Sequence, residues 1–278
     1  MFLLFDIGGT KTRVAAVEKD ATVINEDQFL IFPTPELFDD GVEQIVNAAW
    51  ELTGKKKLEA GCGGVGNPLN QAKSALINSS GKKVFIDWDQ KPLRATLEKS
   101  LDCEIFLEND ALLGGLGEAV FGAGKGTSLV GYLTVGTGVG GAKIENGKIA
   151  PNNFGFELGR QIIQIKKGSP IALRELISGR DIEKRFNQIP SEIKDPAFWQ
   201  ESAHYLAIGI YNAAIFWSVE KIVLGGTITK YIPLEKTQAE FSKLFTGLPF
   251  QPTIEKASLG ELSGLYGALR NLKDKINS

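Results

Sequence analysis

The chain opens with Phe2-Leu3-Leu4-Phe5-Asp6-Ile7-Gly8-Gly9-Thr10-Lys11-Thr12, which the apolar stretch from Val14 to Val17 follows. An apolar run, a glycine turn and a second apolar run are typical of a strand, a tight turn and a returning strand. The same pattern recurs between Leu129 and Ile144, with its turn at Gly136 to Gly141. Further strands and helices follow each copy, so the repeat predicts two related α/β halves.

The junction of the two halves is expected around residues 111 to 126. We therefore predict a two-lobed α/β protein with a small lobe of residues 1–112 and a large lobe of residues 113–278, and with the last helix packing back on the small lobe. A cleft between two such lobes is a natural binding place for a small molecule. Because glycine turns are common, a chance repeat is the alternative.

The composition is that of an ordinary globular protein. Of the 278 residues, 43% are hydrophobic and 23% are charged, and the net charge is −2. These values exclude a mostly disordered or collagen-like chain, and the balanced charge gives no whole-protein attraction to nucleic acid or to an anionic membrane. No apolar run approaches the about 20 residues that span a bilayer, and Asp6 comes too early for a signal peptide. Cys62 and Cys103 are too few for a disulfide scaffold, so we expect reduced thiols in a soluble, cytoplasmic protein.

Glycine contributes 32 residues, well above the average of about 7%, and its clusters follow apolar runs. Backbone N–H groups in such turns form a concave nest for an anion, above all phosphate. Thr10 and Thr137 would add hydroxyl donors and Lys11 a positive charge, whereas Asp6 could hold Mg²⁺ through a water molecule. Two ordinary hairpins are the alternative, and the spacing excludes a P-loop.

Two acidic positions outside the turns are candidates for chemistry. Asp110 follows the expected strand Glu104 to Leu107 and precedes an expected helix from Ala111 to Phe121, where a carboxylate can point into a cleft and accept a proton. Its alternative role is the N-cap of that helix. Glu157 lies among apolar residues and glycines and could bind hydroxyl groups, or could be a surface acid. His204 is the only histidine, and its setting favours a packing or surface role over a catalytic triad.

Apolar spacing and turn residues predict the remaining elements. These are a continuing strand from Ala21 to Phe32, a helix from Leu37 to Leu52, a return strand from Ala142 to Glu145, a hairpin turn at Asn146-Gly147, a helix from Phe198 to Val219 and a strand from Ile222 to Leu224.

Taken in order, these segments resemble the ROK family of bacterial sugar kinases, within the actin-like ATPase superfamily. The stretch from Asp6 to Thr12 looks like the family's first phosphate motif, Glu108-Asn109-Asp110-Ala111 like its catalytic motif, and Leu133 to Gly141 like its second phosphate motif. Val223 to Thr227 looks like the adenosine-side glycine turn, and Leu259 to Ala268 like the closing segment. The resemblance spans essentially the whole chain.

The resemblance implies a ribonuclease-H-like fold with duplicated βββαβαβα halves, and phosphoryl transfer from ATP with Mg²⁺ to a sugar hydroxyl. By the same resemblance, Asp110 would be the base that accepts the hydroxyl proton, and Asn109 and Glu157 would bind sugar hydroxyls beside Arg160. A homodimer is also implied. The residues implied around the metal and the nucleotide are Asp6 on the Mg²⁺ side, Gly8, Gly9, Thr10, Lys11, Gly136, Thr137 and Gly138 at the phosphates, and Gly225 and Gly226 against the adenosine.

Departures from the family's pattern concern the sugar side. Many members place His after Glu-x-Gly and a Cys-rich zinc motif after that, whereas Arg160 follows Glu157-Leu158-Gly159 here and no Cys or His stands between Arg160 and Arg185. We therefore expect no structural zinc, and altered sugar contacts, because arginine is always charged and only donates hydrogen bonds. Near Trp88 there is no clear match for the family's sugar-contacting Asn.

Two alternatives stand beside an ATP-dependent kinase of a hexose or amino sugar. Polyphosphate-dependent glucokinases of the family also lack the zinc motif, and Lys125, Lys166 and Lys167 would then be candidates for a polyphosphate track. A non-catalytic sugar- or nucleotide-binding regulator would bind ligand without turnover. Family repressors carry a DNA-binding helix-turn-helix before the first phosphate motif, for which a motif at Asp6 leaves no room, so no nucleic-acid partner is expected.

Overall fold

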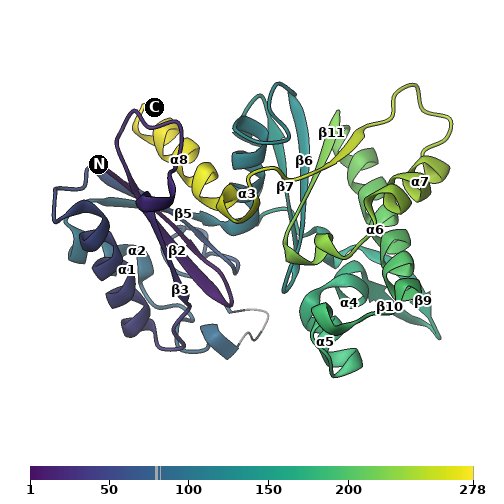
Figure 1. The fold of residues 1–278 in the computed structure, drawn as a ribbon, viewed down its shortest axis with the longest axis horizontal. Helices are drawn as coiled ribbons and strands as arrows, with labels where there is room; N and C mark the ends of the chain where they lie inside the picture. Colours follow the sequence, from purple (N-terminus) through teal and green to yellow (C-terminus); the bar gives the residue numbers. More distant parts are fainter. Residues whose placement is uncertain (79–80, 82, 278) are drawn as a thin grey trace. The chain divides into compact units, whose positions relative to one another are not determined.

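The computed structural model describes residues 1–78, 81 and 83–277, and within them the chain divides into two compact units (Figure 1). The first unit comprises Met1–Gly117, Asn153–Gly155 and the chain from Leu262 onward. The second unit comprises Glu118–Asn152 and Phe156–Glu261. Each unit is built around its own β-sheet.

The elements of the first unit are, in chain order, β1 (Phe2–Ile7), β2 (Lys11–Val17), β3 (Phe29–Pro33), α1 (Phe38–Thr53), β4 (Ala60–Val65), α2 (Leu93–Leu101), β5 (Glu104–Asn109), α3 (Asp110–Val120), which ends in the second unit, and α8 (Ser263–Ile276). The strand order is β3-β2-β1-β4-β5. β1 is antiparallel to β2, and β2 to β3, whereas β1, β4 and β5 run parallel. Parallel neighbours need crossover connections, which α1 and α2 provide.

Alternate residues of β1 face opposite sides of this sheet. Leu3, Phe5 and Ile7 are fully buried and share one hydrophobic cluster with side chains of α1 and α2. Asp6 therefore faces the other side, where Gly264 of α8 comes close: a Cβ atom at Gly264 would lie 3.3 Å from Cγ of Asp6. The sheet is thus covered by α1 and α2 on one face and by α8 on the face that carries the acid.

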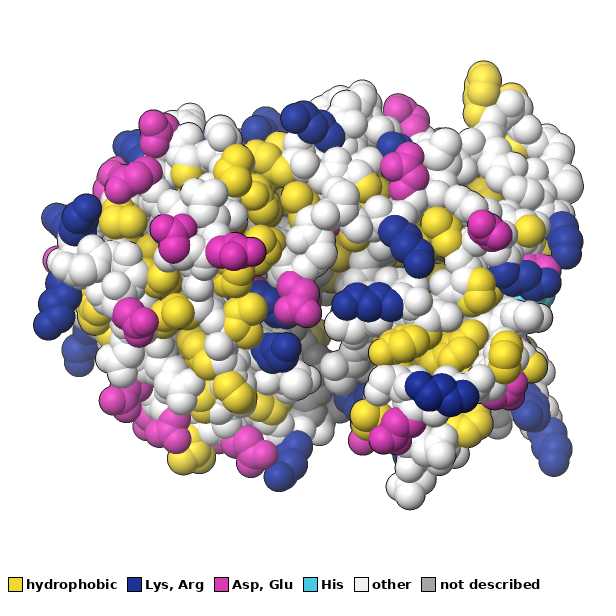
Figure 2. All heavy atoms as spheres, in the orientation of Figure 1, with side chains coloured by type: hydrophobic (Ala, Val, Ile, Leu, Met, Phe, Trp, Pro, Cys, Tyr) yellow, Lys and Arg dark blue, Asp and Glu magenta, His cyan; other side chains and the backbone are white. Residues whose placement is uncertain are grey.

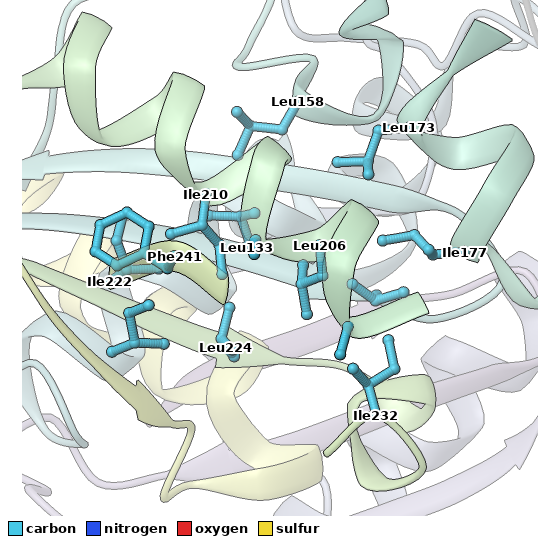
Figure 3. Close-up of a cluster of buried hydrophobic side chains, with 14 of the residues drawn as sticks. Leu133, Leu158, Leu173, Ile177, Leu206, Ile210, Ile222, Leu224, Ile232 and Phe241 are labelled. Carbon is cyan, nitrogen blue, oxygen red and sulfur yellow. The ribbon is translucent and has the colours of Figure 1, made fainter. Parts of the chain in front are cut away.

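The elements of the second unit are β6 (Leu129–Val135), β7 (Val139–Glu145), β8 (Lys148–Ile149), β9 (Ile162–Lys166), β10 (Ser169–Ala172), α4 (Leu173–Ile177), α5 (Gly179–Phe186), α6 (Pro196–Trp217), β11 (Lys221–Gly225), α7 (Leu234–Leu244) and β12 (Thr253–Lys256). The main sheet has the order β12-β11-β6-β7-β8, and β9 and β10 form a separate ribbon. The core packs this sheet against α6 and α7. Figure 3 shows Leu133 and Leu224 of the sheet with Leu206 and Ile210 of α6, all buried.

The two main sheets share one topology. If β6, β7, β8, β11 and β12 take the places of β1, β2, β3, β4 and β5, the strand order and the parallel and antiparallel pairs are the same in both units. The segment from β9 to α5 is an addition between β8 and α6. The topology confirms the prediction of two duplicated α/β halves.

Two predicted elements differ from the structure. The strand expected from Ala21 to Phe32 is wrong in its first part, because β3 begins only at Phe29 after a 3-10 turn at Glu26–Gln28. The side chain of Gln28 accepts a hydrogen bond from the backbone N–H of Asn25 (2.8 Å), a local bond that competes with strand pairing. β7 begins at Val139 instead of Ala142, because Gly136 N donates to Gly138 O (2.9 Å) and closes the turn early.

The surface carries charges of both signs. On the face shown in Figure 2, Lys and Arg side chains are interspersed with Asp and Glu side chains, as the net charge of −2 leads one to expect. In residues 1–78, 81 and 83–277, no helix combines the length and the apolar character needed to cross a membrane.

Candidate active site

Asp6 and Asp110 lie at the ends of β1 and β5, the two strands on either side of β4 in the first unit. In the parallel ladder, Asp6 of β1 is the partner of Gly64 on β4, and Gly64 is the partner of Glu108 on β5. Asp110 follows two residues later as the first residue of α3. The carboxyl ends of parallel strands in α/β sheets are where ligands bind, so the sheet itself brings the two acids to a suitable edge.

Glycines leave room around this pair of carboxylates. A Cβ atom at Gly66 would lie 3.2 Å from Oδ2 of Asp110, and one at Gly64 would lie 3.5 Å from Oδ1 of Asp6. At Gly264 of α8 it would lie 3.3 Å from Oδ2 of Asp6. Any side chain at these positions would crowd the acids. The three glycines therefore let the backbone pass close to the two carboxylates without a side chain between them, a role that the sequence motifs did not reveal.

The pKa of Asp6 is raised to about 7, chiefly by burial and then by the negative charge of Asp110. Arg13, the partner of Asp6 on β2, opposes this with Nη1 3.4 Å from Oδ2 of Asp6, yet does not cancel it. Both side chains are largely buried, with 14% of Arg13 and 16% of Asp6 exposed. With a pKa of about 7, the carboxyl group of Asp6 gains or loses its proton near neutral pH. A cation beside Asp6 and Asp110 would favour the charged carboxylate.

The start of α3 separates the roles of Asn109 and Asp110. Oδ1 of Asn109 accepts hydrogen bonds from the backbone N–H groups of Ala111 (3.1 Å) and Leu112 (3.3 Å), the geometry of an N-cap. Oδ1 of Asp110 accepts from Ala111 N as well (2.8 Å). Asn109 thus takes the capping role that was the alternative for Asp110, and its amide N–H₂ is the group it could offer to a ligand.

Thr34, at the end of β3, fixes the turn from Gly8 to Lys11. Its hydroxyl donates to Gly8 O (2.7 Å) and its backbone N–H donates to Thr10 O (3.1 Å). Gly8 N donates to Lys11 O across the turn (3.0 Å), and the side chains of Thr10 and Lys11 are exposed. Nothing in the local sequence pattern pointed to Thr34, because its contacts depend on the pairing of β2 with β3.

The turn from Gly136 to Gly138 in the second unit joins β6 and β7. The backbone of α5 tightens it: Gly179 N donates to Gly136 O (2.8 Å) and Arg180 N donates to Thr137 O (3.2 Å). A Cβ atom at Gly138 would meet nothing within 4 Å, and one at Gly136 would meet only Oγ1 of Thr227, at 3.9 Å. The turn therefore presents an uncrowded backbone, as a phosphate nest requires.

Gly225 and Gly226 end β11 beside this turn. Gly226 has φ +89°, and a Cβ atom there would lie 2.3 Å from Val135 O, at the end of β6. At Gly225 it would lie 2.2 Å from the hydroxyl of Tyr132. Only glycine fits this close approach of two strand ends, which places Gly225 and Gly226 next to the Gly136 turn.

Glu157 precedes a 3-10 turn, Leu158–Arg160, whose last residue is Arg160. The turn packs against the start of β7. Nε of Arg160 lies 3.1 Å from Oε2 of Glu157, and both side chains are partly exposed (49% and 37%). The close packing is set by Gly159, where a Cβ atom would lie 2.5 Å from Val139 O. Glu157 and Arg160, the residues of the second unit predicted to bind sugar, thus form an ion pair near the turn from Gly136 to Gly138.

Asn67 and Asn78 form an amide pair that the sequence motifs missed. Nδ2 of Asn67 donates to Oδ1 of Asn78 (3.1 Å), and Asn78 N donates to Oδ1 of Asp89 (2.7 Å). Asn67 is 2% exposed and directly follows Gly66, the glycine beside Asp110. Trp88, near which a sugar-contacting Asn was sought, is itself a core residue packed on Phe38 and Phe85.

The remaining candidates lie apart from these groups. Lys166 and Lys167 stand at the exposed tip of the β9–β10 ribbon, and Lys125 is exposed in the turn after α3. His204 is on the surface of α6, with Nδ1 3.2 Å from Oε2 of Glu240. Among the described residues, no three His, Cys, Asp or Glu side chains form a group that could hold a metal ion.

The predicted site residues fall into two groups, one in each unit. The first unit holds Asp6, Gly8, Gly9, Thr10, Lys11, Asn109 and Asp110, and the second holds Gly136, Thr137, Gly138, Glu157, Arg160, Gly225 and Gly226. The first group contains the carboxylates of Asp6 and Asp110, and the second contains the glycine turn from Gly136 to Gly138 beside Gly225 and Gly226.

Comparisons with known proteins agree with this architecture. A family model described as ROK family matches residues 3–275. A glucokinase of Streptomyces coelicolor is 24% identical, over 95% of this chain and 94% of its own length. A ROK hexokinase from Thermus thermophilus has a similar structure, with a TM-score of 0.81 at 25% identity over 99% of each chain. A ROK family glucokinase from Streptomyces griseus, solved with glucose and AMPPNP, gives a TM-score of 0.80 at 23% identity, again over 99% of each chain.

Proposed function

The chain belongs to the ROK family and is a sugar kinase, and from that premise we propose that it transfers the terminal phosphoryl group of ATP, with Mg²⁺, to a hydroxyl of a hexose or amino sugar. The observation that carries the proposal is the pair Asp6 and Asp110, which the sheet places at the ends of β1 and β5, with only glycine backbone packed beside their carboxylates. Phosphoryl transfer asks mainly for positioning and for neutralisation of charge. The two groups of site residues offer both.

Asp110 would act as the general base. Its carboxylate stands at the start of α3, and Gly66 keeps the space beside Oδ2 clear of a side chain. A sugar hydroxyl that enters this space would donate its proton to Asp110 as its oxygen attacks the phosphorus atom. A positioned base of this kind contributes about 10²- to 10⁴-fold to a rate.

The sugar would be oriented by groups that bind hydroxyls. Asn109 would offer its amide N–H₂, because its carbonyl oxygen caps α3. Glu157 would accept hydrogen bonds from hydroxyls, and the guanidinium of Arg160 would hold that carboxylate in place and donate to a sugar oxygen. Arginine donates hydrogen bonds in a fixed planar fork, so we expect Arg160 to narrow the choice of sugar.

The residues of the first unit fit Mg²⁺. This ion is usually held by one or two carboxylates together with substrate phosphates, and Asp6 would hold it through a water molecule. The mutual repulsion that helps to raise the pKa of Asp6 would be offset by a cation at that place. When bound, the ion would neutralise charge on the transferring phosphoryl group.

The donor would lie against the open backbone of the second unit. The N–H groups of Thr137 and Gly138 and the hydroxyl of Thr137 would bind phosphate oxygens, because Gly136 N–H already donates to Gly138 O. In the first unit, Thr10 and Lys11 are the candidate hydrogen-bond donors to phosphate. Gly225 and Gly226 would border the adenosine. The AMPPNP found with the Streptomyces griseus enzyme favours ATP over polyphosphate as the donor, for which Lys125, Lys166 and Lys167 would be the alternative track.

The test is release of ADP from ATP and Mg²⁺ across a panel of hexoses, ketohexoses and N-acetylhexosamines, with polyphosphate as a second donor. We expect turnover with one class of sugar and ATP, and loss of that turnover without Mg²⁺. Turnover with polyphosphate alone would reassign the donor. Binding of a sugar without turnover with either donor would contradict the kinase proposal and indicate a sensor.

A further inference from the structure

A short hairpin, residues 68–77, stands beside the end of β5. Leu69 and Leu76 form a β-bridge, and Ile77 N donates to Pro68 O (2.8 Å). Its tip is a turn in which Lys73 N donates to Asn70 O (2.8 Å) and Ser74 N donates to Oδ1 of Asn70 (2.8 Å). The hairpin is therefore a defined element that can transmit a constraint from its tip to its base.

The two ends of the hairpin lie beside Asp110, the proposed general base. Asn67 and Asn78 join the two ends of the hairpin by their side-chain amides, and Asn67 follows Gly66, whose Cβ position lies 3.2 Å from Oδ2 of Asp110. On its outer side the hairpin is tied to the chain before α2, because Arg94 N donates to Ser74 O and Gln90 N donates to Leu76 O. Leu76 is buried in the hydrophobic cluster of this unit, and the tip of the hairpin makes a further contact toward β5.

Lys73 supplies that contact. Its ammonium group forms an ion pair with Oε2 of Glu108, which is 9% exposed, whereas Lys73 is 49% exposed. Oε1 of Glu108 accepts a hydrogen bond from the backbone N–H of Asn109 (3.1 Å). One carboxylate thus connects the tip of the hairpin to the residue that caps α3 and precedes Asp110. A buried carboxylate needs such a partner, since its charge is costly to hold without one.

The backbone of Lys73 is unusual for its residue type. Its φ is +49°, in the left-handed region that glycine and asparagine adopt more readily. A long charged side chain at this strained position carries its ammonium group to Glu108. An observed outlier of this kind is a reason to ask what the position does.

We propose that Lys73 is a positioning residue for the sugar. Its ion pair with Glu108 fixes the hairpin of residues 68–77 against the end of β5, so that the acceptor hydroxyl lies within hydrogen-bond reach of Asp110. This inference rests on the proposed function for its readout in catalysis. The ion pair also neutralises the carboxylate of Glu108, which lies in the same row of the sheet as Asp6, two strands away. Lys73 touches no reacting atom in this account and acts through Glu108 and Asn109.

The first test replaces Lys73 by Met, which keeps the length of the side chain and removes its charge. We expect the KM for the sugar to rise about tenfold or more, because small displacements of a bound substrate are costly, while the KM for ATP stays as it was. Lys73→Arg should restore the KM for the sugar. Lys83→Met is the matched control, because Lys83 pairs with Glu36 at the surface of the same unit, where both are exposed, and should change neither constant.

A second variant separates positioning from stability. Lys73→Met leaves Glu108 buried without its partner and should lower Tm, whereas Lys73→Met with Glu108→Gln removes the uncompensated charge and should recover Tm. The KM for the sugar should stay raised in this double variant, because the tie to the hairpin is still missing. Recovery of both Tm and KM would overturn the proposal, as would an unchanged KM in Lys73→Met.

Hydrogen exchange in the substrate-free protein gives a readout that does not depend on catalysis. Backbone amides of residues 68–78 should exchange faster in Lys73→Met and in the double variant than in the wild type and in Lys83→Met. Unchanged exchange would overturn the proposal even if no sugar were turned over. Failure of the wild type to phosphorylate any sugar, with faster exchange in the variants, would instead contradict the proposed function and leave the tie itself established.

Discussion

At the end of β1 in the first unit stands Asp6, and at the equivalent place in the second unit stands Thr134. The equivalence follows from the register: Asp6 is the partner of Gly64 on the parallel strand β4, and Thr134 is the partner of Gly225 on β11. On the antiparallel side Asp6 faces Arg13, whereas Thr134 faces Gly140. The same frame thus carries an ion pair in one unit and uncharged groups in the other.

The last strands of the two sheets differ in the same way. β5 leads into α3 with Asp110, a carboxylate beside Gly66. β12 leads instead to Ser258 and Leu259, whose backbone N–H groups donate to the buried carboxylate of Glu118 (3.0 and 2.9 Å). The comparison teaches that the duplicated topology positions strand ends and glycine turns, while the residues placed there set the charge at each end.

The largest effect should be a loss of turnover when Asp110 of the first unit is replaced. Asp110→Asn should lower turnover about 10²-fold or more, or about 2.7 kcal/mol in the barrier, with sugar and nucleotide binding nearly intact. Release of ADP under saturating substrates measures it. The control is Asp102→Asn, an exposed residue at the end of α2 with φ +51°, a conformation that Asn tolerates. Unchanged turnover in Asp110→Asn would contradict the assignment of Asp110 as the general base of the first unit.

In the second unit the corresponding test addresses backbone geometry. Gly226→Ala should lower the free energy of unfolding by about 2 kcal/mol, because φ +89° is unfavourable for alanine and its Cβ would meet Val135 O at 2.3 Å. Gly138→Ala, where a Cβ meets nothing within 4 Å, should leave that free energy unchanged. Urea unfolding of both variants provides the measurement. Equal stability would contradict the view that the second unit depends on glycine backbone at this end.

Much of this comparison follows from local sequence. Apolar runs interrupted by glycine identify β1, β2, β6 and β7, because strand pairing and tight turns depend on neighbouring residues. The recurrence of that pattern predicted the duplicated halves that the strand orders confirm. The position of Asp110 after an apolar strand likewise indicated its place at a strand end.

Other features depend on contacts between distant parts of the chain and have no local signal. The residues packed against the acids are Gly64 and Gly66, together with Gly264 on a helix near the other end of the chain. The anchoring of the first turn by Thr34 and the ion pair of Lys73 with Glu108 arise only when strands are paired. The raised pKa of Asp6 is of the same kind, because burial and Asp110 cause it.

That raised pKa provides the smallest of the expected effects. The pKa of Asp6 is about 7 in the folded protein against an ordinary 3.8, so between these values the folded state binds more protons than the unfolded state. The free energy of unfolding should therefore fall as the pH rises from about 4 to 7. Asp6→Asn removes this titration, and the variant should gain about 1 kcal/mol on the wild type between pH 6 and pH 7. Urea unfolding in Mg²⁺-free buffer measures the difference. Thr134→Ser, at the equivalent position of the second unit, should keep the wild-type dependence on pH.

If the free energy of unfolding varied with pH in the same way for Asp6→Asn and the wild type, burial would not raise the pKa of Asp6. The two strand ends would then differ in residue type but not in the cost of holding a charge.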